Sequence, residues 1–234
     1  AVGYNALTTQ NNDAANYNVA VGYAAGTAIT TGIKNVAVGG LALDAADTGT
    51  ENTAIGHQAL TADTKGQRNV AIGHGSLVTQ NFTSATNSYN TAVGYNSGNA
   101  LTTATDDTIV GALAGDAITT GSGITAVGKA AGGALTTGGD NTAIGKQALK
   151  TATTGTSNTA VGKDALEATT TASNNTAVGF KSLEANTTGS ENVAVGFQAL
   201  NTATTGTNNT AAGHNALFNA TTGAGNVAIG KSAG

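Results

Sequence analysis

Apolar residues in this chain recur in short, evenly spaced runs. A five-residue phrase, Asn-Thr/Val-Ala-Val/Ile-Gly, or a near variant of it ends at fourteen glycines, and eleven of the thirteen intervals between these glycines have the same length, as from Gly22 to Gly39. The two longer intervals run from Gly3 to Gly22 and from Gly73 to Gly94. A short, strict period is typical of a solenoid, in which each repeat forms one coil stacked on the last. We therefore predict one solenoid domain over 1–234, a parallel β-solenoid of about fourteen coils.

Each repeat predicts one short β-strand. Numbered from the repeat glycine as position 0, Val or Ile stands at −1 except at Ala212, Ala at −2 except at Ile109, and Thr or Val at −3. Alternating β-branched residues around a small one are typical of a strand with two different faces. Gly and Thr are poor helix formers, and no 3.6-residue apolar stripe is present. We expect the Val/Ile column to point into the core and the Ala column to point the opposite way.

The second half of the repeat indicates a continuous core. Position +4 is Leu in nine repeats and Gly in five. Four of the Gly repeats carry a large aliphatic residue at +7 instead: Ile29, Leu101, Ile118 and Leu135. Since a missing Leu would leave a cavity costing ~2–5 kcal/mol, the exchange keeps one large group in each coil.

The turns and the strand starts carry polar residues in phase. Many coils close with Thr-Thr-Gly, as at 187–189, where we expect the glycine to supply a positive-φ turn residue. Asn occupies position −4 in eleven of thirteen repeats. Stacked coils would align these side chains into an amide hydrogen-bond ladder. The long intervals predict irregular turns at 4–17 and 74–89, and extra residues must loop outwards because stacked strands keep their register.

Composition limits the remaining classes. The chain has no Cys, Pro, Met or Trp, and 9% of its residues are charged, with a net charge of −4. Disulfides and thiolate metal sites are therefore excluded, and no basic patch for nucleic acid is present. No apolar run approaches the ~20 residues of a membrane span. The absence of methionine leads us to expect a segment of a longer chain.

A near-invariant Ala column and a thin core favour association of parallel chains. A surface position would vary among polar residues, whereas a small residue allows another backbone to approach closely. A coil this short also has little interior for its surface. The alternative is that Ala simply fits a flattened coil interior.

The phrase Asn-Thr-Ala-Val-Gly-x-x-Ala-Leu followed by Thr-Thr-Gly, as in 158–166, resembles the head repeats of trimeric autotransporter adhesins of the Yersinia adhesin type. It is closer to the seventeen-residue version found in tail-fibre-like proteins of bacteriophages and bacterial surfaces. The resemblance covers essentially the whole chain. It implies a homotrimer of left-handed parallel β-rolls, located outside the cell on a cell or virion surface, that serves as an adhesive or spacer fibre.

Two motifs that suggest chemistry are better explained by the repeat. Residues 225–232 match the phosphate-loop pattern G-x-x-x-x-G-K-S, but their middle residues are the repeat's own strand and only two residues follow. His57, His74 and His214 all stand at position +1. Metal binding there lacks a carboxylate or third histidine in phase. We expect no catalytic residues, cofactor or metal.

Position +1 is a candidate contact surface because it accepts Tyr, Phe, Lys, His, Gly and Ala. Lys129, Lys146 and Lys163 stand there in consecutive repeats and suit an acidic polysaccharide or phosphate. Phe82 and Tyr89 lie in the long interval after Gly73 and are expected on an outward loop that suits sugar or protein contact.

The sequence thus predicts a non-enzymatic structural or adhesive fibre segment that extends and presents attachment sites. One alternative is a head that binds a receptor or glycan directly. Another is an ice-binding β-solenoid, which would need Thr-x-Thr pairs on one flat strand face, whereas the Thr pairs here are adjacent and lie beside a turn glycine.

Overall fold

The structure is a computed structural model that describes residues 1–11 and 15–234. The chain is an all-β parallel solenoid of about twelve coils of roughly 17 residues, which confirms the predicted fold class. Part of the irregular turn expected at 4–17 falls on residues 12–14, outside the described residues. In the described ranges, no helix is long and apolar enough to cross a membrane.

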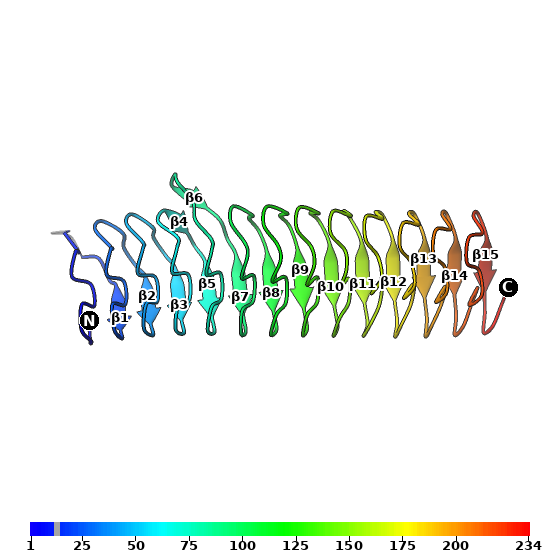
Figure 1. The fold of residues 1–234 in the computed structure, drawn as a ribbon, viewed down its shortest axis with the longest axis horizontal. Helices are drawn as coiled ribbons and strands as arrows, with labels where there is room; N and C mark the ends of the chain where they lie inside the picture. Colours follow the sequence, from blue (N-terminus) through cyan, green and yellow to red (C-terminus); the bar gives the residue numbers. More distant parts are fainter. Residues whose placement is uncertain (12–14) are drawn as a thin grey trace. The chain divides into compact units, whose positions relative to one another are not determined.

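The coils group into two compact units, residues 1–120 and 121–234. Within each unit the main strands lie side by side, one per coil (Figure 1). The first unit contains β1 (Val19–Val21), β2 (Val36–Val38), β3 (Thr53–Ile55), β4 (Gly66–Gln67), β5 (Val70–Ile72), β6 (Thr86–Asn87), β7 (Thr91–Val93) and β8 (Thr108–Val110). The second contains β9 (Thr125–Val127), β10 (Thr142–Ile144), β11 (Thr159–Val161), β12 (Thr176–Val178), β13 (Val193–Val195), β14 (Thr210–Ala212) and β15 (Val227–Ile229).

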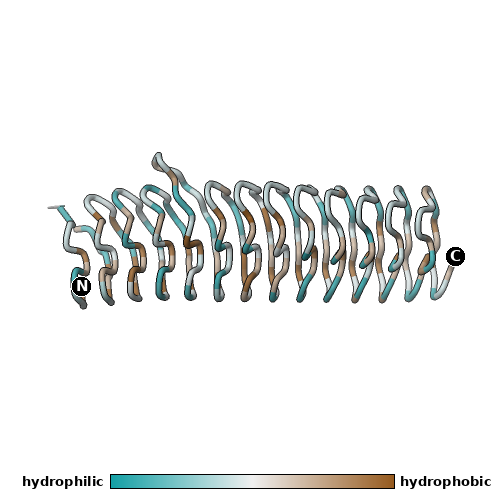
Figure 2. Tube along the Cα trace, in the orientation of Figure 1, coloured by the Kyte–Doolittle hydropathy of each residue, from teal (hydrophilic) through white to brown (hydrophobic). Residues whose placement is uncertain are grey.

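Equivalent residues of successive repeats pair directly. Thr142 pairs with Thr159 and Ile144 with Val161, so every column of the repeat becomes a row along the solenoid. Across the long interval between β5 and β7, Val70 still lies opposite Thr91, so the extra residues do not disturb the strand register. Figure 2 shows the same succession of apolar and polar segments recurring from coil to coil within each unit.

The repeat glycine is required twice over, which explains its strict period. Its φ lies between +121° and +140° in all fourteen copies, a region that other residues rarely adopt. A Cβ on Gly145 would also lie 2.5 Å from the carbonyl oxygen of Gly162 in the next coil. Neither the backbone angle nor the spacing between coils therefore allows a side chain here.

The glycine of Thr-Thr-Gly has a different role from the predicted one. These glycines do not have positive φ; instead, a Cβ on Gly189 would lie 2.2 Å from the carbonyl oxygen of Gly206. Glycine is required here because the backbones of neighbouring coils approach too closely to leave room for a Cβ. The left-handed turn positions are −5, +2 and +4, held in one coil by Ser157, Asp164 and Leu166 with φ of 57°, 58° and 50°.

The Ala column points into the coil, so the expectation that it faces outwards was wrong. Ala143, Ala160 and Ala177 are completely buried. The Val/Ile column lies on the outer face, where Ile144 and Val195 are 39% and 42% exposed. The physical reason is the width of the coil. Where the opposite wall places a Leu in the interior, the strand that faces it carries only a methyl group at −2. Ile109 is buried at this position where the nearby +4 residues are Gly98 and Gly115.

The exchange between positions +4 and +7 is confirmed. Leu149 and Leu166 at +4 are fully buried, as is Leu135 at +7. A Cβ on Gly132 at +4 would lie 2.9 Å from Leu135 Cδ1, so the +7 side chain occupies the space that +4 leaves free. Close packing of this kind is what makes a core sensitive to a single methylene.

The predicted amide ladder is also confirmed. Asn158 donates from its backbone N to Asn141 Oδ1 at 3.0 Å and from Nδ2 to the carbonyl of Ala172 at 2.8 Å. Asn175 repeats both kinds of contact one coil further, and all three Asn side chains are completely buried. These contacts join neighbouring coils and leave no hydrogen-bonding atom of the three amides unpaired, whereas Asp107 and Ile124 take the place of Asn in two repeats.

Candidate functional site

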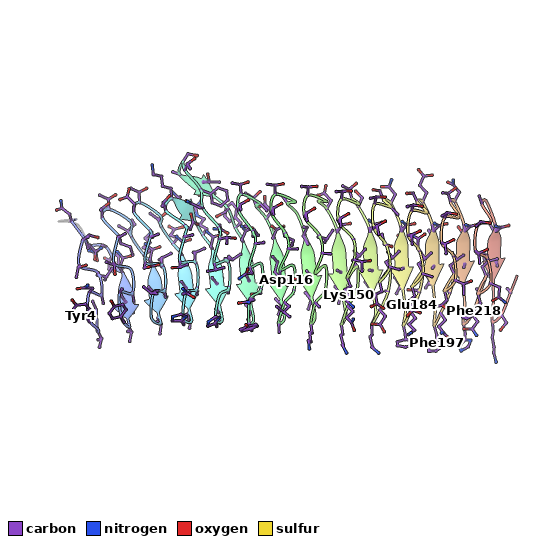
Figure 3. The ribbon with its side chains drawn as sticks, viewed as in Figure 1. Tyr4, Asp116, Lys150, Glu184, Phe197 and Phe218 are labelled. Atoms are coloured by element: carbon purple, nitrogen blue, oxygen red, sulfur yellow. The ribbon has the colours of Figure 1, made fainter. Side chains whose placement is uncertain are left out.

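The residues at position +1 form, within each unit, an exposed row, and we call these residues the edge column. They follow the repeat glycine, where the strand ends and the chain turns, and Figure 3 shows Phe197 at this edge of the second unit. Tyr23, Tyr95 and Phe197 are 60%, 55% and 43% exposed, which confirms the expectation of a surface position. The column consists of Tyr4, Tyr23, Gly40, His57, His74, Tyr95, Ala112, Lys129, Lys146, Lys163, Phe180, Phe197, His214 and Lys231.

Backbone hydrogen bonds between coils hold the edge column in register. The amide of Gln147 donates to the carbonyl of Lys129 at 3.0 Å, and the amide of Asp164 donates to the carbonyl of Lys146 at 3.0 Å. The same contact links Lys181 to Lys163. Adjacent +1 side chains therefore lie one coil apart, and hydrogen bonds between the coils hold their backbone in place.

The aromatic members of the edge column stack on one another. The ring centroids of Phe180 and Phe197 are 5.2 Å apart, and those of Phe197 and His214 are 4.9 Å apart. In the first unit His57 and His74 stack at 5.3 Å, which confirms that they lie one coil apart. Such pairs contribute ~0.5–1.5 kcal/mol each beyond the area they bury. Stacking occupies the ring faces and leaves the ring edges towards solvent.

The two stacked histidines do not form a three-residue metal site. His74 stacks on its other side against Tyr95 at 5.5 Å, and Gly40 precedes His57 in the column. Within residues 1–11 and 15–234, no carboxylate or further imidazole lies close enough to complete a set of three with them.

Lys129, Lys146 and Lys163 form the cationic part of the edge column. All three are exposed. In the described part of the chain, Lys129 and Lys146 make no ion pair, whereas Lys163 Nζ lies 3.4 Å from Asp164 Oδ2 and 5.4 Å from the centre of the Phe180 ring. The structure thus brings together the three lysines that the sequence singled out.

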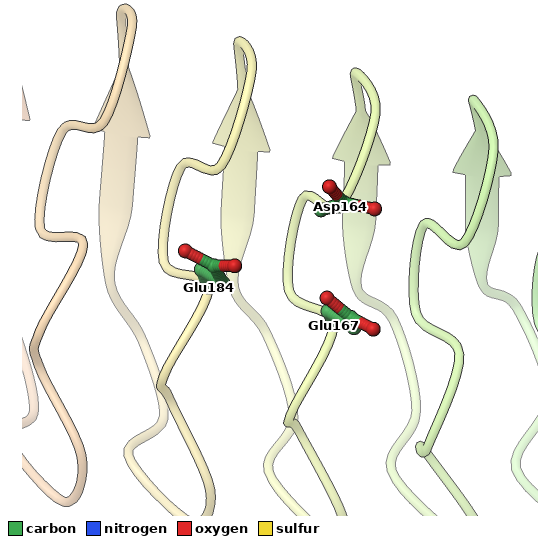
Figure 4. A group of neighbouring side chains, drawn as sticks. All are labelled: Asp164, Glu167 and Glu184. Carbon is green, nitrogen blue, oxygen red and sulfur yellow. The ribbon is translucent and has the colours of Figure 1, made fainter.

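Three carboxylates lie beside this cationic segment. Asp164, Glu167 and Glu184 have oxygens within 4.8 Å of one another, and Figure 4 shows the first two on one coil and Glu184 on the next. Each carboxylate has a lysine partner: Lys163 for Asp164 at 3.4 Å, Lys150 for Glu167 at 3.3 Å and Lys181 for Glu184 at 2.7 Å. This cluster was not predicted from the sequence, although Lys150, Glu167 and Glu184 stand at position +5 of consecutive repeats. Of its three ion pairs, Lys150–Glu167 joins neighbouring coils and the other two lie within one coil each.

Phe82 does not project from the irregular turn as predicted. It is only 7% exposed, and its backbone N donates to Asp63 Oδ1 at 3.2 Å. Thr64 still contacts Asn81 at the regular spacing, whereas Gly66 pairs with Thr86 and Val70 with Thr91. Three of the four extra residues therefore lie within 82–85 and the fourth within 88–90. The buried Asp63 accepts a second bond from Gln80 Nε2 at 2.6 Å. Burial raises the pKa of the Asp63 carboxyl, and its hydrogen bonds oppose that rise.

Tyr89 lies on the surface of the same turn, as expected. It is 50% exposed, and Arg68 contacts it twice, through a 3.2 Å hydrogen bond to its hydroxyl and with the guanidinium 5.7 Å from the ring centre. Arg68 also donates to Glu51 Oε2 at 2.9 Å. Arg68 and Lys34 hold the pKa of the Glu51 carboxyl below its usual value. Tyr89 thus ends an exposed row of charged side chains, separate from Phe82.

The described residues contain no pocket. Comparisons with protein-family models, with curated proteins and with solved structures find no match to the chain.

Proposed function

We propose that this chain is a segment of a non-enzymatic extracellular fibre on a cell or virion surface, in which identical copies associate and the solenoid serves to extend and present attachment sites. The observation that carries the proposal is the outer face of the sheet. Positions −3 and −1 of every strand point outwards, and they form two rows of Thr or Val and of Val or Ile. A solvated sheet face would instead carry charged and polar residues.

The −1 row of the outer face is apolar within each unit, whereas the −3 row contains both Thr and Val. In the second unit Ile144, Val193 and Val195 are 39%, 39% and 42% exposed, although they lie within the strand ladder and not at a frayed end. Covering the remaining exposed surface of each such side chain would contribute roughly 1 kcal/mol. With seven strands in the unit, a partner chain laid along this face would gain several kcal/mol.

A second copy of the chain is the natural occupant of this face. A repeat protein presents the same row at the same spacing on every copy, so two copies match along their whole length and not at one point. We therefore propose that parallel chains associate through the Val/Ile column, and not through the Ala column as the sequence led us to expect. Three chains around one axis is the arrangement that the adhesin resemblance implies.

The test is sedimentation of the purified chain at micromolar concentration, with and without the substitutions Ile144→Lys and Val195→Lys. We expect a trimer for the unaltered chain and a monomer for the double variant. Phe197→Lys is the matched control for Val195→Lys, because it places one lysine at a residue of nearly equal exposure on the edge column. A folded, monomeric unaltered chain would refute the proposal, and so would dissociation by the control alone.

A second function, direct attachment to a receptor or glycan, is favoured by the edge column, which stays exposed when the sheet face is covered. Binding of the trimer to an array of glycans and surface proteins would distinguish this function from a purely spacing role.

The ice-binding alternative is less well supported by the geometry. Each strand places at most one outward Thr beside a Val or Ile, as at Thr142 and Ile144. The first Thr of a Thr-Thr-Gly turn is used between coils, since Thr153 Oγ1 donates to the carbonyl of Thr170 at 3.2 Å. Measurable thermal hysteresis would reverse this ranking.

A further inference from the structure

Charge is distributed unequally between the two units. Residues 121–234 contain six lysines and five carboxylates, a net charge of +1. Residues 1–120 contain two lysines, one arginine and eight carboxylates, a net charge of −5. An anionic ligand would therefore meet less repulsion at the second unit, although the whole chain is acidic.

Within the second unit, three of the five carboxylates are already paired. Asp164, Glu167 and Glu184 are bound by lysines at 2.7 to 3.4 Å. The two lysines at the start of the cationic segment, Lys129 and Lys146, extend into solvent with no ion pair in the described part of the chain. Their charge is available to a ligand.

The remaining members of the column are also favourable to negative charge. Beyond Lys163, the rings of Phe180, Phe197 and His214 stack face to face, so their edges point outwards. The edge of an aromatic ring carries the positive part of its quadrupole. Lys163 and Lys181 lie 5.4 and 5.7 Å from the centre of the Phe180 ring, which continues the positive potential from the lysines onto the rings.

We propose that the edge column from Lys129 to His214 binds a linear acidic polysaccharide, with the polymer lying along the column and its carboxylates on the ammonium groups. Adjacent side chains lie one coil apart, a spacing of ~4.8 Å set by parallel strand pairing, which is comparable with the length of one sugar unit. A polymer with a charge on every sugar can therefore place successive carboxylates on successive lysines. Three weak contacts on one polymer then act together as a multivalent site.

The same geometry disfavours single-stranded nucleic acid. Proteins that bind it non-specifically offer free aromatic faces on which bases stack. Here Phe197 is covered on both faces by Phe180 and His214, and Phe180 is covered by Phe197 and by lysine ammonium groups. The column offers edges and charges, which suit carboxylates better than bases.

The test is titration of the full chain with oligogalacturonates of one, three and six sugars, in 50 mM and 500 mM NaCl. We expect the hexamer to bind at least tenfold more tightly than the trimer, the monomer to show no measurable binding, and high salt to abolish binding. The variant Lys129→Gln/Lys146→Gln/Lys163→Gln should lose at least tenfold in hexamer affinity. The control Lys34→Gln/Lys65→Gln/Arg68→Gln makes the same change in net charge within residues 1–120 and should keep affinity within twofold.

Equal loss in both triple variants would overturn the proposal, because attraction would then depend on total charge and not on the column. Equal affinity for a neutral polymer such as dextran, or tighter binding of a thymidine oligonucleotide than of the hexamer, would also overturn it. Sedimentation of the same samples separates this result from the proposed association: the three edge lysines lie off the outer sheet face, so their variant should remain a trimer whether or not it binds.

Discussion

Moving the large side chain of one coil from position +4 to +7 tests the interpretation of the core most directly. Leu149→Gly empties the interior of one coil, and Ala152→Leu adds a side chain at the position from which Leu135 fills the preceding coil. Both sites are completely buried. In the preceding coil, the Leu135 side chain reaches the space above Gly132, at 2.9 Å from where its Cβ would lie. The double variant therefore copies an arrangement that the chain already uses.

The magnitudes are large enough to measure. Leu149→Gly should destabilise by about 2–5 kcal/mol, the cost of a buried Leu cavity. Its φ of 50° is strained for Leu, and relief of ~1 kcal/mol offsets the backbone entropy of the new glycine. Ala152→Leu alone should cost about 1–3 kcal/mol because it overpacks a filled core. If one cavity is shared, the double variant should lie within about 1 kcal/mol of the unaltered chain.

The assay is guanidinium unfolding followed by circular dichroism, with hydrogen exchange of the 145–161 amides as a local readout. The control pair is Leu149→Gly with Ala203→Leu, which places the two changes in separate coils, and we expect its effects to add. If the Ala152 double variant is destabilised by the sum of its single changes, positions +4 and +7 do not fill one space and the reasoning is refuted.

Three further predictions concern the ladder, the repeat glycine and the buried carboxylate. Asn175→Ala should destabilise by about 3 kcal/mol, because it leaves the backbone N of Asn192 and the carbonyl of Gly189 buried without their partner; faster exchange of amides in the adjoining coils would show it, and unchanged exchange would contradict it. Gly145→Ala should lower the free energy of unfolding by about 3 kcal/mol or more, because of the φ of 135° and the contact with the next coil. The control Gly225→Ala should lower it by about 1 kcal/mol, because the new Cβ would meet nothing within 4 Å. Equal melting temperatures of the two variants would argue against the clash. Burial raises the pKa of the Asp63 carboxyl above its unfolded value, so protonation of this group stabilises the folded chain as pH falls through the folded pKa, and that stability is lost as pH rises above it. Asp63→Asn should therefore remove this part of the pH dependence of the melting temperature between pH 7 and 4. Identical slopes of melting temperature against pH in the two chains would refute the assignment.

The period, the strands, the exchange between +4 and +7 and the amide ladder could be predicted from the sequence alone. Each of them follows from stacking one repeat on another, because equivalent residues then become neighbours. Each residue type must therefore pack against, or hydrogen-bond to, another copy of itself. Asn158 meets Asn141 and Asn175 for this reason, and Leu135 appears where Gly132 has lost its side chain. The exposure of the edge column could also be predicted, because position +1 accepts residue types as different as Lys, Phe and Gly.

The tertiary structure alone decided which face of the strand is inside. Alternation identifies two faces, but the choice between Ala143 and Ile144 depends on how far the opposite wall of the coil lies from the strand. Width depends on the left-handed turns at −5, +2 and +4, which non-glycine residues such as Leu166 occupy without a local sequence signal. Phe82 is buried because the longer turn after Gly73 folds back over Asp63, a contact between residues of different coils. Where the repeat is regular, neighbours can be read from the period; where it is irregular, or where an interior dimension matters, only the packed coil determines which side chains meet.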